Sequence, residues 1–315
     1  MAAPPTAPAT AEAADLVVEH VSERPLDLGL TLAPLRHGAG DPTVRRTPDG
    51  AVWRTSLLPS GPVTQRLVAT GERSAVVHLW GPGARQAAGQ LPDLLGEHDD
   101  VAGFVAPPQV RRAALRAAGM RMPRSGRVME ALVPAVLEQK VQVVTAHRAW
   151  RLLVTRRGTP APGPAPEGMR VVPDARTWAS LPVWEWHRAG VDPRRASTVA
   201  RCARVTARLE EAAGLPGGEA RGRLELVPGV GVWTSAEVAQ RALGDADAVS
   251  VGDFHLAAAV GWALTGERTD DDGMLQLLAP YAPHRHRVVR LLFLDRRPQA
   301  PRRGPRLPIP AHLAV

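Results

Sequence analysis

One carboxylate and one glycine-rich turn have the residue types and spacing that suit chemistry on a charged ligand. Asp253 lies in residues 251–256 (Val-Gly-Asp-Phe-His-Leu), directly before an apolar stretch that predicts a helix. The positive end of the helix dipole favours an ionised carboxylate there, and such a group can stabilise positive charge in a reacting molecule. The alternative is that Asp253 only caps the helix, which is a common role for aspartate.

The glycine-rich turn is Pro228-Gly229-Val230-Gly231, between two stretches that predict helices, the second running to Leu243. Gly229 and Gly231 can adopt positive φ, and without a Cβ they let another molecule approach the backbone closely. The N–H groups at the start of the helix that contains Thr234 suit an anion such as a DNA phosphate. An ordinary turn between two packed helices is the alternative.

Composition limits the classes of protein that remain. The 315 residues suggest about two domains, and the net charge of +8 with a pI near 11.1 points to a polyanionic partner. A single cysteine, Cys202, excludes an internal disulfide and cysteine-rich zinc or iron–sulfur sites. No signal peptide and no membrane-length apolar run is evident, so we expect a cytoplasmic protein without a membrane partner.

The elements that position these residues predict an α+β fold. A small N-terminal domain at 15–108 is expected to hold an antiparallel sheet, followed by an all-α domain at 109–295. Within the first domain, four leucines with period-two spacing at 26–32 predict a strand, and Thr47-Pro48-Asp49-Gly50 predicts a hairpin. Further predicted elements are strands at 63–68 and 75–80 and helices at 84–95, 128–144, 145–154, 178–186, 193–213, 254–264 and 284–294. Flexible tails are expected at 1–14 and 296–315, the second rich in arginine and proline.

Three segments in order along the chain resemble the helix-hairpin-helix DNA glycosylases. They are 132–141 (Leu-Val-Pro-Ala-Val-Leu-Glu-Gln-Lys-Val), 226–234 (Leu-Val-Pro-Gly-Val-Gly-Val-Trp-Thr) and 251–256. Within that superfamily the chain resembles the bacterial 3-methyladenine DNA glycosylase II branch, over roughly residues 25–294. The resemblance implies a strand-rich N-terminal part followed by the helical glycosylase domain.

The resemblance also implies roles for particular residues. Asp253 falls on the position of the essential aspartate, which would stabilise an oxocarbenium-like transition state and orient water. The DNA-binding residues implied are Gly229, Val230, Gly231, Thr234, Gln139 and Lys140. A monovalent cation at the main-chain oxygens of Glu225, Val227 and Val230 is an optional feature of the family's hairpin, and no other cofactor is expected.

The same comparison predicts the reaction type and the base pocket. Family members that also cut the strand use a hairpin lysine, whose position here is Trp233, so we expect a monofunctional enzyme that leaves an abasic site. The implied pocket residues are Trp233, Glu237 and His284, the last two replacing aromatic residues of the family. Lys140, the single lysine, replaces the apolar wedge that fills the gap left by the flipped base. We expect Lys140 to contact phosphate and Gln139 to wedge. The spacing of His78, His147 and His255 does not predict a metal site.

These features predict a monomeric DNA glycosylase of base excision repair, cytoplasmic and associated with the nucleoid. Its partner would be double-stranded DNA that contains damaged bases. The expected substrates are flipped-out alkylated purines of the 3-methyladenine and 7-methylguanine type, because a cationic base leaves readily and stacks well on an aromatic ring. Two alternatives stay open: a catalytically silent protein that binds damaged DNA through the hairpin, and a glycosylase for a deaminated base.

Overall fold

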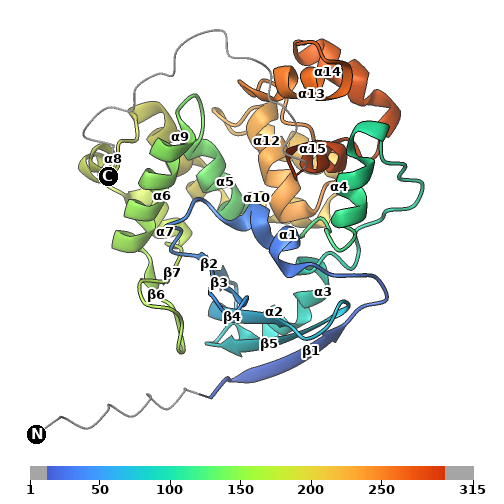
Figure 1. Ribbon diagram of the computed structural model, residues 1–315. Coiled ribbons are helices and arrows are strands. Elements are labelled where there is room, and N and C mark those ends of the chain that lie inside the picture. Colours follow the sequence, from blue (N-terminus) through green and yellow to red (C-terminus); the bar gives the residue numbers. More distant parts are fainter. Residues whose placement is uncertain (1–12, 295–315) are drawn as a thin grey trace, which may run out of the picture.

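The structure is a computed structural model that describes residues 13–294 (Figure 1). The predicted tails at 1–14 and 296–315 lie outside these residues, apart from Ala13 and Ala14. The predicted fold class is confirmed: a small antiparallel sheet is followed by a larger helical region. Within residues 13–294, every helix is too short or too polar to traverse a lipid bilayer.

The sheet has five antiparallel strands in the order β1-β5-β4-β3-β2. They are β1 (Leu16–Val21), β2 (Val44–Arg46), β3 (Val52–Leu58), β4 (Gly61–Ala69) and β5 (Ser74–Trp80). The predicted β2–β3 hairpin and the strands β4 and β5 are confirmed; β1 was not predicted as a strand. Alternate residues of β4 and β5 point into one core, where Val63, Leu67, Val77 and Leu79 are fully buried. The helices α2 (Ala84–Gly89) and α3 (Leu91–Leu94) pack on this sheet.

The strand predicted at 26–32 is wrong, because the segment forms the short helix α1 (Leu28–Leu32). Asp27 starts the helix by accepting a hydrogen bond from the Leu30 amide at 2.9 Å. Leu28 and Leu32 are four residues apart, so one helical face buries both. A period-two leucine pattern also contains pairs four residues apart, which suit a helix as well as a strand. Here the capping by Asp27 favours the helix.

The helical region begins after Pro107 and continues to Leu294. Its helices are η2 (Pro108–Val110), α4 (Arg111–Arg116), α5 (Val128–Leu137), α6 (Val143–Arg157), α7 (Ala175–Ser180), α8 (Val183–Arg188), α9 (Pro193–Arg204), α10 (Thr206–Glu210), η3 (Glu211–Gly214), α11 (Gly217–Glu225), α12 (Val232–Val238), η4 (Ala239–Leu243), α13 (Leu256–Thr265), α14 (Asp271–Leu278), η5 (Ala279–Tyr281) and α15 (Arg285–Leu294). A two-stranded ribbon of β6 (Thr159–Pro160) and β7 (Arg170–Val171) interrupts them. The helix predicted at 128–144 ends already at Leu137, and a turn in which Lys140 has φ of 55° leads into α6, which begins at Val143 and includes the helix predicted at 145–154.

The helix α1 and the segment that follows it join the sheet to the helices. The Arg290 guanidinium donates to the Leu30 carbonyl at 2.6 Å, and Arg241 donates to the Pro34 carbonyl at 2.9 Å. This segment, which includes η1 (Ala33–Leu35), therefore packs between the sheet and the helices (Figure 1). The domain boundary at residue 108 stays a prediction, since contacts cross it in several places.

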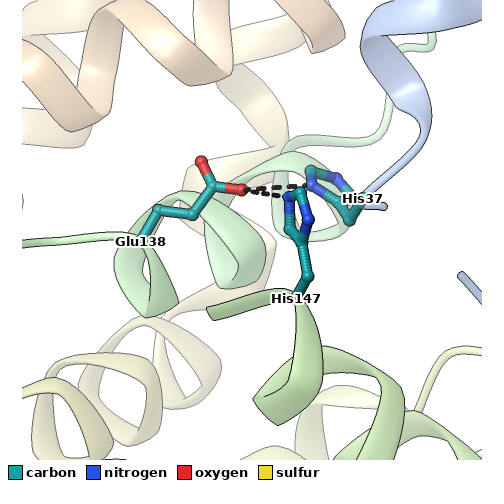
Figure 2. Close-up of side chains that lie close together, drawn as sticks. All are labelled: His37, Glu138 and His147. Atoms are coloured by element: carbon teal, nitrogen blue, oxygen red, sulfur yellow. Dashed lines mark ion pairs between the residues drawn. The ribbon is translucent and has the colours of Figure 1, made fainter. Parts of the chain in front are cut away.

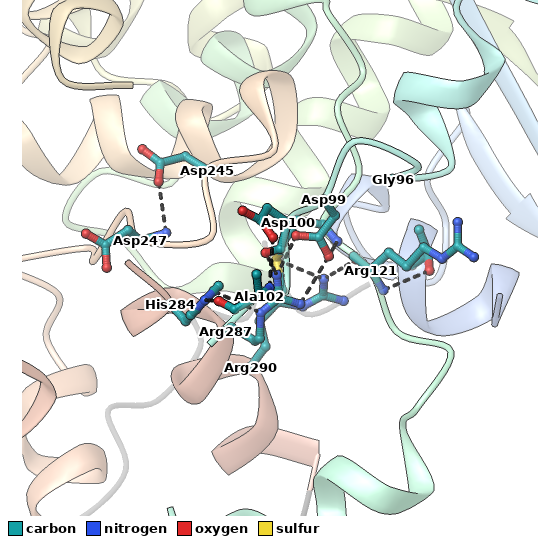
Figure 3. A network of polar contacts seen from close by, with 12 residues as sticks. Gly96, Asp99, Asp100, Ala102, Arg121, Asp245, Asp247, His284, Arg287 and Arg290 are labelled. Atoms are coloured by element: carbon teal, nitrogen blue, oxygen red, sulfur yellow. Dashed lines mark hydrogen bonds and ion pairs between the residues drawn. The ribbon is translucent and has the colours of Figure 1, made fainter. Parts of the chain in front are cut away.

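A buried ion pair fastens α15 to the loop after α3 (Figure 3). Both Nη atoms of Arg287 donate to the carboxylate of Asp99, with one contact at 3.1 Å, and the two side chains are 3% and 1% exposed. Asp99 also accepts a hydrogen bond from the Met122 amide at 3.0 Å. A backbone amide on a third segment thus completes the hydrogen bonding of the Asp99 carboxylate.

Cys202 lies in α9, inside the main helical core, and its side chain is fully buried. Burial in this apolar environment raises the pKa of the thiol to about 12. The cysteine is therefore protonated at neutral pH and serves as a small apolar core residue.

Candidate functional site

The predicted hairpin is confirmed between α11 and α12. The Val230 amide closes the turn on the Val227 carbonyl at 2.9 Å. Gly229 has φ of +100°, and a Cβ there would lie 2.3 Å from Oγ1 of Thr198 on α9. Gly231 differs from the prediction: its φ of −110° and ψ of −176° are extended, and a Cβ there would have no atom within 4 Å. Gly229 is thus required by the fold, whereas Gly231 leaves open space outside the backbone.

The different surroundings of Gly229 and Gly231 allow effects on folding to be distinguished from effects on ligand binding at the hairpin. Gly231→Ala should leave the stability of the free protein unchanged, because the added methyl group meets nothing. If a DNA backbone approaches Gly231, the same methyl group should weaken DNA binding, measured by fluorescence anisotropy. Gly229→Ala is the matched comparison and should lower the unfolding free energy by about 1–3 kcal/mol through strain. Equal DNA affinity of Gly231→Ala and the parent chain would contradict a close backbone approach at that residue.

Gln139 holds the hairpin from the end of α5. Its amide nitrogen donates to the Gly229 carbonyl at 2.9 Å and to the Thr234 hydroxyl at 2.8 Å. Both bonds would have to break before the side chain could enter a duplex, and the wedge role of Gln139 stays a prediction. In the DNA-free chain, Gln139 positions the hairpin. Thr234 and Val230 are 2% and 5% exposed, so only their main-chain atoms can meet a ligand.

Asp253 faces the helix that follows the hairpin. Its Oδ2 accepts a hydrogen bond from the indole N–H of Trp233 at 3.2 Å. Its Oδ1 accepts from the amides of His255 and Leu256 at 2.8 and 2.9 Å. Both predicted roles are therefore compatible: one oxygen caps α13, and the other joins the Trp233 side chain beside the hairpin. The carboxylate is partly exposed, which leaves it accessible to a ligand.

A polar cluster holds the segment before Asp253 against α12 and η4. Glu237 forms an ion pair with Arg241 at 2.7 Å and accepts a hydrogen bond from the Ser250 hydroxyl. Gln240 donates to the Ala248 carbonyl at 2.9 Å and to the Ser250 hydroxyl at 2.8 Å. The segment that carries Asp253 is consequently held against α12 and η4, and Trp233 lies on α12. Glu237 acts here as a positioning residue, and its predicted place in a base pocket stays a prediction.

Comparisons with known proteins agree with this geometry. No protein-family model matches the chain. A Mycobacterium tuberculosis relative, named as a probable bifunctional transcriptional activator/DNA repair enzyme AlkA, is 32% identical over 155 residues. The matched region is 49% of this chain and 31% of the relative, so the chain spans about a third of that protein's length.

Solved structures share the fold over nearly the whole chain. The 3-methyladenine DNA glycosylase of Archaeoglobus fulgidus has a TM-score of 0.74 at 18% identity, covering 89% of this chain and 99% of its own. The chain therefore has the fold of this DNA glycosylase. A second solved structure with the same fold is the Clostridium acetobutylicum 8-oxoguanine glycosylase/lyase bound to double-stranded DNA, with a TM-score of 0.67 at 11% identity, covering 91% of this chain and 99% of its own. The resemblance predicted from the three sequence segments is thereby confirmed.

Not every residue expected from the glycosylase superfamily meets at the Asp253 site. His284 is 5% exposed, and its ring lies edge-on to Phe104, with Nε2 and the Ala102 carbonyl 3.2 Å apart (Figure 3). These contacts place it beside the loop after α3, and its pocket role stays a prediction. Lys140 is exposed at the apex of the α5–α6 turn, next to Gln139, so its side chain is free to meet a ligand near the hairpin.

Sequence reasoning missed one group of residues in this glycosylase fold. His37, Glu138 and His147 point toward one another at the junction of the segment after α1 with α5 and α6 (Figure 2). The spacing of His147 to the other histidines does not predict a metal site. His37 lies far from the other two residues in the sequence, and Glu138 and His147 lie on either side of the turn between α5 and α6. No local sequence pattern predicts that these three residues come together.

Proposed function

We propose that the chain is a monofunctional DNA glycosylase of base excision repair. It hydrolyses the N-glycosidic bond of flipped-out alkylated purines, of the 3-methyladenine and 7-methylguanine type, and leaves an abasic site. The observation that carries the proposal is the placement of Asp253, with one carboxylate oxygen on α13 and the other beside Trp233 and the hairpin. The AlkA relative and the shared glycosylase fold support the same class of activity.

The chemistry follows from a partly exposed carboxylate in a fixed orientation. Breaking the glycosidic bond develops positive charge on the sugar, and an ionised Asp253 would stabilise that charge and orient an attacking water. An alkylated purine already carries positive charge, so it leaves without a general acid. The face of the Trp233 ring would hold such a base through a cation–π contact. Asp253 also favours the enzyme over a silent DNA-binding protein, which needs no carboxylate beside the sugar.

The hairpin supplies the DNA contact in this proposal. The backbone around Gly229 and Gly231 is exposed, and three apolar side chains near it and near Asp253 are also exposed, namely Leu226, Val232 and Phe254 at 78%, 57% and 91%. Large apolar side chains left exposed beside the hairpin and Asp253 support a contact surface there. The backbone would bind phosphates, with a monovalent cation at the main-chain oxygens of Glu225, Val227 and Val230. The partner is double-stranded DNA with damaged bases, bound by a monomer in the cytoplasm at the nucleoid.

The test is a base-release assay with the full chain. Methylated duplex DNA should release 3-methyladenine and 7-methylguanine, detected by chromatography, with an equal amount of abasic sites. Absence of both bases would contradict the alkylpurine activity. Single-lesion duplexes that contain hypoxanthine or uracil test the deaminated-base alternative. DNA binding without release from any duplex would favour the silent binder.

A borohydride trap on the same reactions separates hydrolysis from strand cutting. A lyase forms a Schiff base between an amine and the abasic sugar, which borohydride reduces to a stable protein–DNA complex. We expect no trapped complex, because Trp233 occupies the hairpin position at which family lyases carry lysine. Since Lys140 is the chain's only lysine, a trapped complex that disappears in Lys140→Gln would assign lyase chemistry to that residue and overturn the monofunctional proposal.

A further inference from the structure

Three metal-binding side chains meet at the junction of three segments. His37 follows η1, Glu138 directly follows α5, and His147 lies on α6. Their ligand atoms all lie within 4.8 Å of one another, and Figure 2 shows the three side chains converging on a common point. Oε1 of Glu138 is 3.4 Å from Nδ1 of His37 and 3.5 Å from Nε2 of His147.

These distances suit ligands of one metal ion better than direct hydrogen bonds. Hydrogen bonds from a ring N–H to a carboxylate are usually about 2.7–2.9 Å long. Zinc bonds to nitrogen and oxygen are about 2.0–2.2 Å, and two donors at the corners of a tetrahedron with such bonds are about 3.3–3.5 Å apart. The two separations from Glu138, 3.4 and 3.5 Å, therefore match edges of a tetrahedral zinc site, and the two histidine nitrogens lie within 4.8 Å of each other.

The donor set and its burial point to the same class of ion. Two imidazoles and one carboxylate are ligands that Zn²⁺ accepts, whereas Mg²⁺ and Ca²⁺ prefer oxygen donors alone. The side chains of His37 and Glu138 are 7% and 14% exposed, and that of His147 is 28% exposed. Three protein ligands with one partly open side leave a fourth position for water.

Neighbouring residues fix the two rings. Gly38 has φ of +85°, and a Cβ there would lie 2.7 Å from Nδ1 of His147, so glycine is needed for the ring to lie in this position. The His37 ring packs edge-on against Trp150, with 5.6 Å between the centroids. The buried carboxylate of Asp41 accepts hydrogen bonds from the His37 amide at 2.6 Å and from the Trp150 indole at 3.1 Å. Such outer contacts orient ligands before the metal arrives.

The positive charge of Arg241 would oppose cation binding at this site, but an ion pair with Glu237 offsets it. Arg241 is close enough for its charge to act on Glu138. Its guanidinium is paired with the carboxylate of Glu237 at 2.7 Å, which reduces the repulsion that an incoming cation would meet.

We propose that His37, Glu138 and His147 form a Zn²⁺ site that braces the turn between α5 and α6. Glu138 and His147 lie on the two sides of that turn, and His37 belongs to the segment that joins it to the sheet. An ion bound by all three would hold Gln139 and Lys140 in place from both sides. The site itself does not depend on the proposed glycosylase activity, since metal binding and stability report it directly.

The experiment titrates the chelator-treated full chain with Zn²⁺ against a chromophoric chelator. We expect one Zn²⁺ per chain and a higher Tm with Zn²⁺, but no such rise with Mg²⁺. His147→Ala and Glu138→Gln should each weaken binding at least about 100-fold and abolish the Zn²⁺-dependent rise in Tm. Co²⁺ should give the visible absorption bands of a four-coordinate site in the parent chain and lose them in both variants.

His98→Ala is the matched control, because His98 is exposed and pairs with Asp93 at 2.8 Å away from the three ligands. It should bind Zn²⁺ as the parent chain does. Metal-free Tm values of all variants establish that each one folds. A parent chain that binds no Zn²⁺, or a His147→Ala variant that binds it with parental affinity, would overturn the proposal.

Discussion

Asp253→Asn is expected to reduce the rate of base release by about 10²- to 10³-fold, the usual effect of removing a preorganised electrostatic partner of a transition state. The amide keeps the shape of the side chain but loses the charge that would stabilise the sugar cation. Its oxygen can still accept from the His255 and Leu256 amides, and asparagine caps helices as well as aspartate does. Release measured at saturating enzyme, together with DNA affinity by anisotropy, checks this result, and the affinity should stay within about two-fold.

A second capping aspartate provides the control. Asp174 starts α7 by accepting a hydrogen bond from the Thr177 amide at 2.7 Å, a cap in a different part of the helical region. Asp174→Asn should leave base release unchanged. If Asp253→Asn releases bases as fast as the Asp174 variant, Asp253 only caps α13 and the catalytic assignment is lost.

The largest loss of stability is expected from Arg287→Met. The substitution removes the partner of the Asp99 carboxylate, which is 1% exposed, and breaking a buried pair on one side usually costs about 3–5 kcal/mol. Urea unfolding followed by circular dichroism measures the change. Arg208→Met is the matched control, because the Arg208–Glu211 pair is exposed and its loss should cost at most about 1 kcal/mol.

A double variant distinguishes an unpaired charge from lost packing. Asp99→Asn combined with Arg287→Met removes both charges, so the double variant should be more stable than Arg287→Met alone. A double variant that is less stable by the sum of the two single changes would show that the ion pair makes no coupled contribution. The loop after α3 would then be held by its backbone contacts.

Local sequence patterns predicted the hairpin well because its geometry is decided within a few residues. Pro228 follows the end of the preceding helix. Gly229 has a positive φ, and Thr198 leaves no room at this position for a Cβ. The place of Asp253 was implied by the resemblance to the helix-hairpin-helix glycosylases, and the structure puts its carboxylate beside Trp233 on α12. What the sequence did not reveal is that Trp233 donates to this carboxylate.

Residues that meet across long separations were outside the reach of such patterns. The resemblance implied a wedge role for Gln139 as the neighbour of Lys140. No local pattern indicates that its side chain reaches Gly229 and Thr234 from the end of α5. The strand predicted around Leu28 was wrong for a different reason. Leucines at every second position also include pairs four residues apart, and such pairs lie on one face of a helix. The cluster of His37, Glu138 and His147 exists only because three segments pack together, and their spacing along the chain carries no signal.

The sealed thiol of Cys202 has a consequence for a protein that would work on alkylated DNA. Methylating agents attack thiolates readily, and a reactive cysteine would make such a protein a target of the compounds whose damage it removes. Here the sulfur is fully buried and its pKa is about 12, so almost none of it is the nucleophilic form. While the protein is folded, its single cysteine is therefore protected from reaction with electrophiles.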